Sequence, residues 1–180
     1  MKKKYLLLLL IPVLVMCLTA CTSINGTSKD GKTITLEDSK YGKTTLTYDK
    51  KLNYSDFKEV KGKASKEITF KNTDLNIKVQ MYYNKMKAAS YDETKKSRMT
   101  QTYYKDMVFN NNPGYFYSND RNSGNINVVL YTDSKTSDTT VLFVAVEKID
   151  NKKDTDMFSM LDSEDISNLF NSIVFENSSK

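Results

Sequence analysis

The sequence predicts an α+β fold in which helices pack on a mainly antiparallel sheet of about six or seven strands. Hydrophobic and polar residues alternate along 75–83, which is typical of a strand with one buried face. The runs 126–131 and 141–146 are apolar on both faces or nearly so, which indicates strands in the middle of a covered sheet. Two further segments have helical periodicity, and the short links between the later strands favour antiparallel pairing.

The expected strands follow one another with short connections. Three early ones, at 33–36, 44–48 and 67–71, are short, rich in β-branched or aromatic residues, and bounded by Gly, Asp or Asn. After the alternating strand at 75–83, residues 115–118 and 126–131 are expected to form a hairpin around a glycine-containing loop.

Two helices are expected to cover the sheet. The first begins at Ser90 with a capping box to Glu93 and ends at 110–114, with an apolar stripe of Met99, Tyr103 and Met107. The second begins at Asp162 or Ser163, and its buried face consists of Ile166, Leu169, Phe170 and Ile173. The predicted order of elements is therefore β-β-β-β-α-β-β-β-α.

The amino-terminal segment has the layout of an export signal. Three lysines precede an apolar run of about 14 residues, which is shorter than the roughly 20 that a membrane-spanning helix needs. The run ends in Leu18-Thr19-Ala20-Cys21, which resembles the lipobox of bacterial lipoproteins. That resemblance implies cleavage after Ala20 and attachment of diacylglycerol and palmitate-type acyl chains to Cys21, an anchor that two chains make stable.

These features divide the chain into four parts. We expect a lipoprotein signal peptide at 1–20, a lipidated cysteine with a flexible tether at 21–32, one globular domain at 33–176 and a polar tail at 177–180. The alternatives are a plain signal peptide and an uncleaved anchor.

Charge and composition exclude several kinds of activity. The formal net charge is +5, but without residues 1–20 it is +2, which does not indicate a nucleic-acid-binding protein. The chain has no histidine, and its only cysteines are Cys17 and Cys21. Histidine-based triads, imidazole metal sites and a disulfide within the domain are therefore not available. We accordingly expect no enzymatic activity, no metal and no cofactor.

Three local motifs resemble functional sites without their context. Residues 26–33 match the phosphate-loop pattern, but they precede a predicted strand rather than a helix, so we interpret them as tether and expect no nucleotide binding. Residues 55–58 form an S-x-x-K sequence without the partner motifs of penicillin-recognising enzymes, and we interpret them as a solvated turn. Residues 150–156, and separately Asp120 with Asn122, carry many oxygen ligands but lack the glycine of a calcium loop. They are interpreted as polar loops, with weak calcium binding at 150–156 left as an alternative.

The tyrosines provide the candidate binding surface. The chain has 12 tyrosines and no tryptophan, and several of them belong to the predicted core or strand faces. Tyr82 and Tyr104 are expected on the side opposite the apolar stripe of their elements. A patch of exposed aromatic rings suits contact with a protein or a glycan, whereas scattered surface tyrosines have no such role.

The domain also resembles a known family. It is similar to the PsbP-like family of photosystem II extrinsic proteins and their bacterial lipoprotein relatives in three respects. These are the order of its elements, the strand Gly114-Tyr115-Phe116-Tyr117 before a long hairpin, and the closing segment 169–175 (Leu-Phe-Asn-Ser-Ile-Val-Phe). The resemblance covers most of 40–176 and implies an α/β/α sandwich that acts as an accessory module beside membrane complexes. Because this chain has no histidine, a metal role that depends on that residue does not carry over.

The expected function is therefore a non-enzymatic binding or accessory module. We expect it to be lipid-anchored on the extracytoplasmic face of a bacterial cell membrane, with a protein or glycan partner in the envelope. One alternative is a carboxylate-dependent enzyme of the cell envelope, such as a glycan hydrolase, which needs two acids facing one cleft. A solute receptor is a third hypothesis, although 160 residues are few for two lobes.

Overall fold

A seven-stranded antiparallel sheet forms the centre of the molecule. The computed structural model describes residues 32–48, 53–59, 65–71, 76–149 and 156–178. The strand order in this sheet is β3-β4-β5-β9-β8-β7-β6. The strands are β3 (Asn53–Glu59), β4 (Ser65–Lys71), β5 (Asn76–Lys87), β6 (Tyr103–Phe109), β7 (Asn112–Ser118), β8 (Ser123–Thr132) and β9 (Asp138–Lys148). The predicted α+β class with a mainly antiparallel sheet is confirmed, and β9 and β8 occupy the interior positions that their apolar runs indicated.

A second, three-stranded sheet, which the sequence did not predict, packs on the first. Its order is β1-β2-β10, from β1 (Lys32–Asp38), β2 (Gly42–Tyr48) and β10 (Val174–Asn177), all antiparallel. At Gly42, where φ is +126°, a Cβ atom would lie 2.3 Å from the Glu176 carbonyl oxygen, so only glycine allows this approach of β2 and β10. The Tyr83 hydroxyl on β5 joins the two sheets through hydrogen bonds to the Leu36 carbonyl (2.8 Å) and the Thr44 hydroxyl (2.7 Å).

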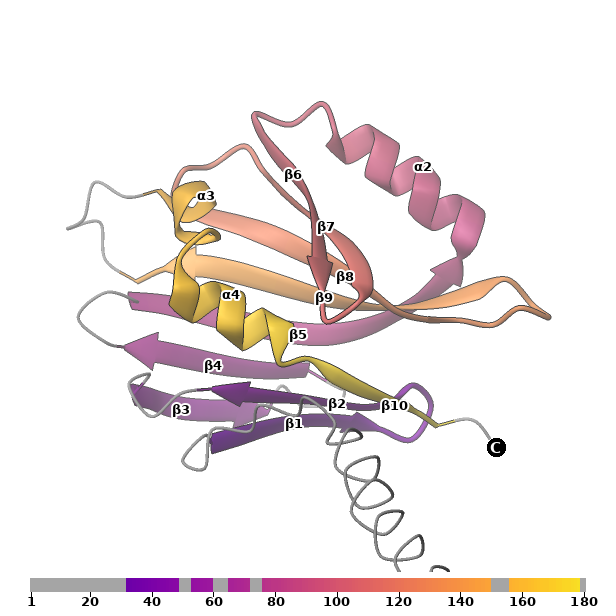
Figure 1. Cartoon of the computed structure of the whole chain (residues 1–180), viewed down its shortest axis with the longest axis horizontal. Helices are drawn as coiled ribbons and strands as arrows, with labels where there is room; N and C mark the ends of the chain where they lie inside the picture. The colour runs from indigo at the N-terminus through magenta and orange to yellow at the C-terminus, as the bar shows by residue number, and fades with distance from the viewer. Residues whose placement is uncertain (1–31, 49–52, 60–64, 72–75, 150–155, 179–180) are drawn as a thin grey trace, which may run out of the picture.

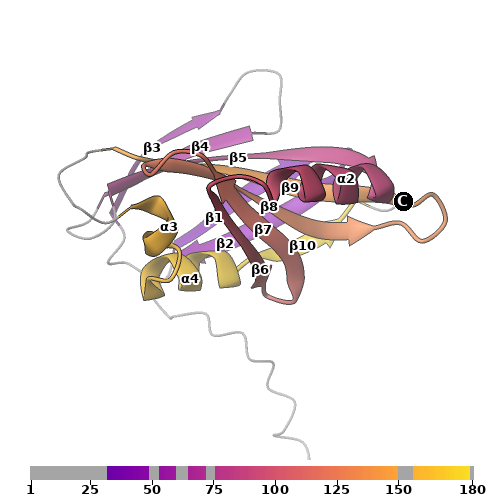
Figure 2. The same ribbon diagram turned by 90° about the horizontal axis from the view of Figure 1, so that it is seen from above.

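Helices lie on both sides of the large sheet, namely α2 (Ala88–Arg98), α3 (Met157–Met160) and α4 (Glu164–Asn171). Both ribbon views show α2 well apart from α3 and α4 (Figures 1 and 2). Ser163 caps α4, because its Oγ accepts a hydrogen bond from the Ile166 amide, as the predicted start of the second helix required. Among the described residues, no helix has both the length and the apolar character needed to cross a membrane.

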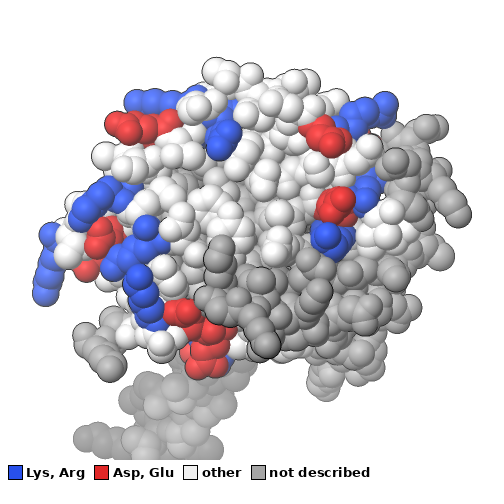
Figure 3. All heavy atoms as spheres, turned by 180° about the vertical axis from the view of Figure 1, so that it is seen from behind, with Lys and Arg blue, Asp and Glu red and all other residues white. Residues whose placement is uncertain are grey.

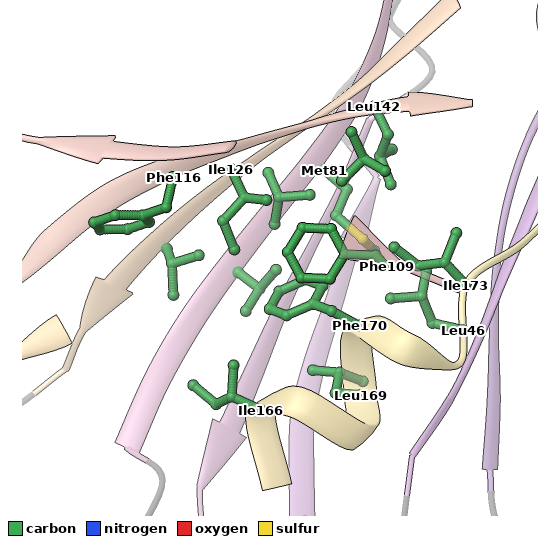
Figure 4. Packing of buried hydrophobic residues seen from close by; sticks show 14 of the residues in the cluster. Leu46, Met81, Phe109, Phe116, Ile126, Leu142, Ile166, Leu169, Phe170 and Ile173 are labelled. Carbon is green, nitrogen blue, oxygen red and sulfur yellow. The ribbon is translucent and has the colours of Figure 1, made fainter. Parts of the chain in front are cut away.

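The main core lies between the large sheet, α4 and the small sheet. Alternate residues of β5 (Ile77, Val79, Met81) face it, together with Leu142 and Val144 of β9. Figure 4 shows the side chains of α4 pointing toward the sheet, where Phe170 packs edge-on against Phe109 at a centroid distance of 5.6 Å. We call the side of the large sheet that carries this core the core face.

A smaller cluster occupies the opposite side of the sheet, which we call the outer face. There Tyr91 of α2 packs against Tyr115 and Val141, all three of them buried. Helix α2 contacts β5 and β9 and also reaches β7, where Tyr91 packs against Tyr115 at a centroid distance of 5.7 Å, and β6, where Lys95 pairs with Asp106 at 2.7 Å. The helix therefore covers the β6–β7 part of the outer face. The other two described helices, α3 and α4, bury their apolar side chains in the main core instead.

The first predicted helix is wrong in its second half. The helix begins after Lys87 without a side-chain cap and ends at Arg98, so the proposed capping box at Ser90 is not used. Tyr103 and Met107, expected on the helix, lie on strand β6. Asn110 and Asn111 have φ values of 46° and 65°, and they form the tight turn between β6 and β7 rather than a helix terminus.

The interpretation of residues 55–58 as a turn is also wrong. These residues belong to β3, which pairs with β4 from Asn53↔Lys71 to Glu59↔Lys66. The register shifts between Ser55 and Lys58, so the sequence places an irregularity in an edge strand there instead of a helical turn.

Candidate functional site

Both predicted surface tyrosines lie on the outer face of the large sheet. The cross-strand register aligns Tyr82 of β5 with Phe143 of β9, Asn127 of β8 and Tyr115 of β7. Tyr104 of β6 aligns with Tyr117 in the adjacent row. We call the rings of Tyr82, Tyr104, Tyr117 and Phe143, together with the fully buried Tyr115 on which Tyr104 packs, the outer aromatic surface.

Tyr82 is the most accessible ring of this surface. It is 38% exposed and stacks on Phe143 with a centroid distance of 5.2 Å and an interplanar angle of 14°. Burial, and to a smaller extent the neighbouring Tyr117, raise the pKa of the Tyr82 hydroxyl above its usual value. Tyr82 is therefore a neutral ring at physiological pH, held against Phe143 and partly open to solvent.

Tyr104 lies at the other end of the surface, in a hydrogen-bonded group beside α2. It stacks on Tyr115 at 5.9 Å, and its hydroxyl donates a hydrogen bond to Asp106 (2.9 Å), which also pairs with Lys95 of α2 (2.7 Å). The hydrogen bond from Lys95 is the main reason why the pKa of Asp106 is lowered. Burial is the main reason why the pKa of Tyr104 is raised, and the bond to Asp106 adds to it. Tyr104 is only partly exposed, and its hydroxyl is already engaged.

Two polar atoms beneath this surface have no hydrogen-bond partner in the described part of the chain. Asn127 is 1% exposed; its Nδ2 donates to the Tyr115 hydroxyl (2.7 Å), while its Oδ1 is unpaired. The buried Nε of Arg98 is likewise unpaired, and the guanidinium lies 4.8 Å from the Tyr117 ring centroid. A buried polar atom without a hydrogen-bond partner is costly, so these two atoms are unsatisfied polar groups of the folded domain on this face.

A shallow hollow of about 290 Å³ lies beside Tyr82 on the same face. Ala145 is the small residue at its centre, since its cross-strand neighbours are Gln80 on β5 and Asn125 on β8. We call this the amide hollow; it is lined by Lys78, Gln80, Ser123, Gly124, Asn125, Ala145, Val146 and Glu147. Neither the Gln80 nor the Asn125 side chain forms a hydrogen bond with another described residue.

Charge on this side of the molecule lies mainly toward its margins. Figure 3 shows the side opposite α3 and α4, and its central area consists of uncharged atoms. At the edge of the amide hollow, Lys78 pairs with Glu147 at 3.2 Å. The candidate site is therefore aromatic and amide-rich, with its charged side chains compensated in pairs.

A second, larger hollow of about 420 Å³ lies near the β8–β9 turn. Its lining includes Asp133, Asp138, Lys85 and Tyr131. Asp138 pairs with Lys87 (2.7 Å) and Lys85 (3.5 Å), and the hydrogen bond from Lys87 is the main cause of its lowered pKa. The pKa of Asp133 is also lowered, chiefly by the backbone amide of Lys135. Both carboxyl groups are thus held ionised.

The other predicted sites fall largely outside the described residues. Residues 1–31 are not described, and they include the signal peptide at 1–20, the cleavage site at Ala20, the lipidation site Cys21 and most of the tether and of the phosphate-loop pattern. Residues 150–155 of the candidate calcium loop and 179–180 of the tail also lie outside the described residues. Asp156, the last residue of that loop, caps α3 by accepting a hydrogen bond from the Ser159 amide (2.7 Å). Asp120 accepts from the Asn122 amide (2.7 Å) in the β7–β8 loop.

Within the described ranges, no group of three or more histidine, cysteine, aspartate or glutamate residues is arranged to hold a metal ion. No family model matches the sequence, and neither a curated protein nor a solved structure matches it. The candidate site is therefore defined by its geometry and chemistry.

Sequence reasoning found Tyr82 and Tyr104 but missed their neighbours. The sequence pattern places Phe143 in a covered strand, Tyr117 in the first strand of a hairpin and Asn125 in the loop of that hairpin, so it does not bring the three residues to a common face. The run 141–146 contains one indication of the hollow. The small residue Ala145 interrupts the larger apolar residues of this run, and the hollow forms at that position.

Proposed function

We propose that this protein is a membrane-anchored extracytoplasmic lipoprotein of a bacterial cell, and that it acts as a non-enzymatic binding module. The observation that carries the anchor is the sequence Leu18-Thr19-Ala20-Cys21 after a basic, apolar leader. The accessory role beside a membrane complex follows the resemblance to PsbP-like proteins. The binding role is supported by the outer aromatic surface, where one exposed tyrosine lies beside a hollow with unengaged amides.

The arrangement of the sheets is compatible with display from a membrane. Strand β1, the first described element after the tether, contributes Ile34 and Leu36 to the core on the core face of the large sheet. The outer aromatic surface lies on the opposite face. A tether joined to β1 would therefore leave this surface open to a partner.

The alternative of a carboxylate-dependent glycan hydrolase has less support. Such an enzyme needs a general acid whose pKa is raised, beside a second carboxylate. The two acids that share the larger hollow, Asp133 and Asp138, both have lowered pKa values. They therefore lack the property that the mechanism requires.

The anchor is tested by exchanging each of the two cysteines in turn. Cys21→Ser should abolish acylation and release the protein from membranes into the medium, because the thiol is the attachment point. Cys17→Ser is the matched control: it lies in the apolar run outside the lipobox and should leave the protein in the membrane fraction. The measurement is membrane fractionation together with incorporation of labelled palmitate. A Cys21→Ser protein that stays in the membrane fraction would contradict the proposed anchor.

The binding role is tested with the intact lipoprotein in native membranes. A photo-crosslinking residue at position 82 should trap a ligand from the envelope, whether protein or polysaccharide, and the same residue in place of Tyr131 should not. Tyr131 is a suitable comparison because it is 40% exposed but lines the other hollow. Equal labelling at both positions, or none at position 82, would remove the support for a binding surface.

A further inference from the structure

The structure points to a ligand class for the outer aromatic surface: we propose that it binds a neutral glycan chain. This inference rests on the proposed binding function and makes it more specific. Two features carry it, namely the stacked, accessible Tyr82 and the amide hollow next to it. They lie on the same face of adjacent strands, in neighbouring rows of the sheet.

The first feature supplies an apolar platform. A sugar ring has one or two faces of C–H groups, which pack against an aromatic ring, while its hydroxyls project around the edge. Tyr82 provides such a ring, and its stacking on Phe143 at 5.2 Å fixes its orientation before any ligand arrives. A ring that is already ordered loses little conformational entropy on binding.

The second feature supplies hydrogen bonds of the right kind. A sugar hydroxyl both donates and accepts, and a side-chain amide does the same through its NH₂ and carbonyl groups. The amides of Gln80 and Asn125 face the hollow from either side of Ala145, and both are unengaged by other described residues.

The electrostatics favour an uncharged ligand. Lys78 and Glu147 at the end of the hollow pair with each other at 3.2 Å, so the lining presents no uncompensated charge. An anionic polymer would be recognised by cationic groups directed at it, whereas the Arg98 guanidinium lies against the ring of Tyr117.

The size and openness of the site favour a chain over a small isolated solute. A hollow of about 290 Å³ is slightly smaller than the range of about 300–1,000 Å³ for pockets that enclose small molecules, so it accommodates one ring-sized unit. Residues two apart on a strand are roughly 7 Å apart, so the rows of Tyr82 and Gln80 offer adjacent positions for successive sugar units.

The test uses the intact lipoprotein in phosphatidylcholine vesicles, titrated calorimetrically with oligosaccharides of N-acetylglucosamine and of glucose, and with oligogalacturonate as the anionic comparison. We expect at least one neutral series to bind. Tyr82→Ala should weaken it by about tenfold, which corresponds to about 1.4 kcal/mol. Ala145→Leu should also abolish or strongly weaken binding, because it fills the hollow without removing a contact group. Tyr82→Phe should retain binding, and Tyr131→Ala should leave it unchanged.

Three results would overturn the glycan inference: no neutral series binds, only the anionic series binds, or Tyr82→Ala and Ala145→Leu bind as the unaltered protein does. Circular dichroism of each variant shows whether a loss of binding comes from unfolding, and the response to Tyr82→Phe separates stacking from the hydroxyl. If position 82 crosslinks a protein while every oligosaccharide fails, the glycan inference is wrong but the binding module stands. A Cys21→Ser protein retained in membranes would instead refute the anchor alone.

Discussion

Replacing Tyr83 with Phe should destabilise the domain by about 1–3 kcal/mol. The Tyr83 hydroxyl is buried and joins β5 to the small sheet through the Leu36 carbonyl (2.8 Å) and the Thr44 hydroxyl (2.7 Å). Each net hydrogen bond is worth about 0.5–1.5 kcal/mol, and the Thr44 side chain, which is 0% exposed, would lose this partner. The ring and its packing against Tyr41, at a centroid distance of 5.6 Å, are kept.

Chemical denaturation, followed by far-ultraviolet circular dichroism on a chain that begins at Thr22, measures this loss. The midpoint should fall while the denaturant dependence stays constant. Tyr82→Phe is the matched control, because it is the same change at the next residue on the opposite, partly exposed face, and it should shift stability by no more than about 0.5 kcal/mol. Equal effects of the two substitutions would refute the argument that this hydroxyl joins the two sheets.

The same hydroxyl predicts a loss of stability in alkali. Burial is the main cause that raises the pKa of Tyr83 from 10.0 to about 12. Below pH 10 the hydroxyl is protonated in both the folded and the unfolded chain. Between pH 10 and 12 only the unfolded chain releases the proton, so the free energy of unfolding falls by up to about 2.7 kcal/mol. Tyr83→Phe should remove this part of the alkaline decline; an unchanged decline would assign it to other groups.

Two further substitutions test the packing and the capping. Gly124→Ala should destabilise the domain by about 1–3 kcal/mol, because the new Cβ would lie 2.2 Å from the Phe116 ring; the measurement is the melting temperature. Combining it with Phe116→Leu should recover part of the lost stability. An unchanged melting temperature in Gly124→Ala would contradict this contact. Asp156→Ala should cost about 0.5–2 kcal/mol at neutral pH by removing the cap on the Ser159 amide. Because that hydrogen bond is the main reason why the pKa of Asp156 is lowered, the stabilisation is present above pH 3.8 and is lost as the pH falls further. The difference between Asp156→Ala and the unaltered chain should therefore shrink in acid, and a constant difference would rule out the carboxylate as its source.

Strands of the large sheet could be predicted where the pattern of apolar residues along the sequence matches the side chains that are buried in the fold. Alternation at 75–83 and the apolar run at 141–146 are direct consequences of their positions beside the core. The error at Met99, Tyr103 and Met107 has a simple cause: residues four apart share one face of a helix and also one face of a strand, so this spacing does not separate the two. The Asn110-Asn111 pair, which tolerates positive φ, was the signal for a hairpin.

The candidate site was less predictable because it depends on register. Tyr82 could be assigned to an exposed face from β5 alone. Its alignment with Phe143, and the position of Ala145 between Gln80 and Asn125, depend on the pairing of β5 with β9 and of β9 with β8. The β5–β9 pairing joins residues more than 50 positions apart in sequence throughout its length, from Ile77↔Lys148 to Lys87↔Asp138. No local pattern specifies such a pairing.

The pairing within the small sheet also constrains the order in which parts of the chain can fold. The strands of the large sheet pair mostly with sequence neighbours, in the hairpins from β3 to β5 and from β6 to β9, whereas β2 pairs with the last strand, β10, in a register that joins Thr45 to Val174. The Thr47 amide and the Ser172 hydroxyl add a further link across 125 positions (2.8 Å). Because contacts between distant segments form late, β2 remains without its second neighbour until the end of the chain has been synthesised. A nascent chain stopped before residue 174 would therefore leave β2 as an open edge, available for pairing with another molecule.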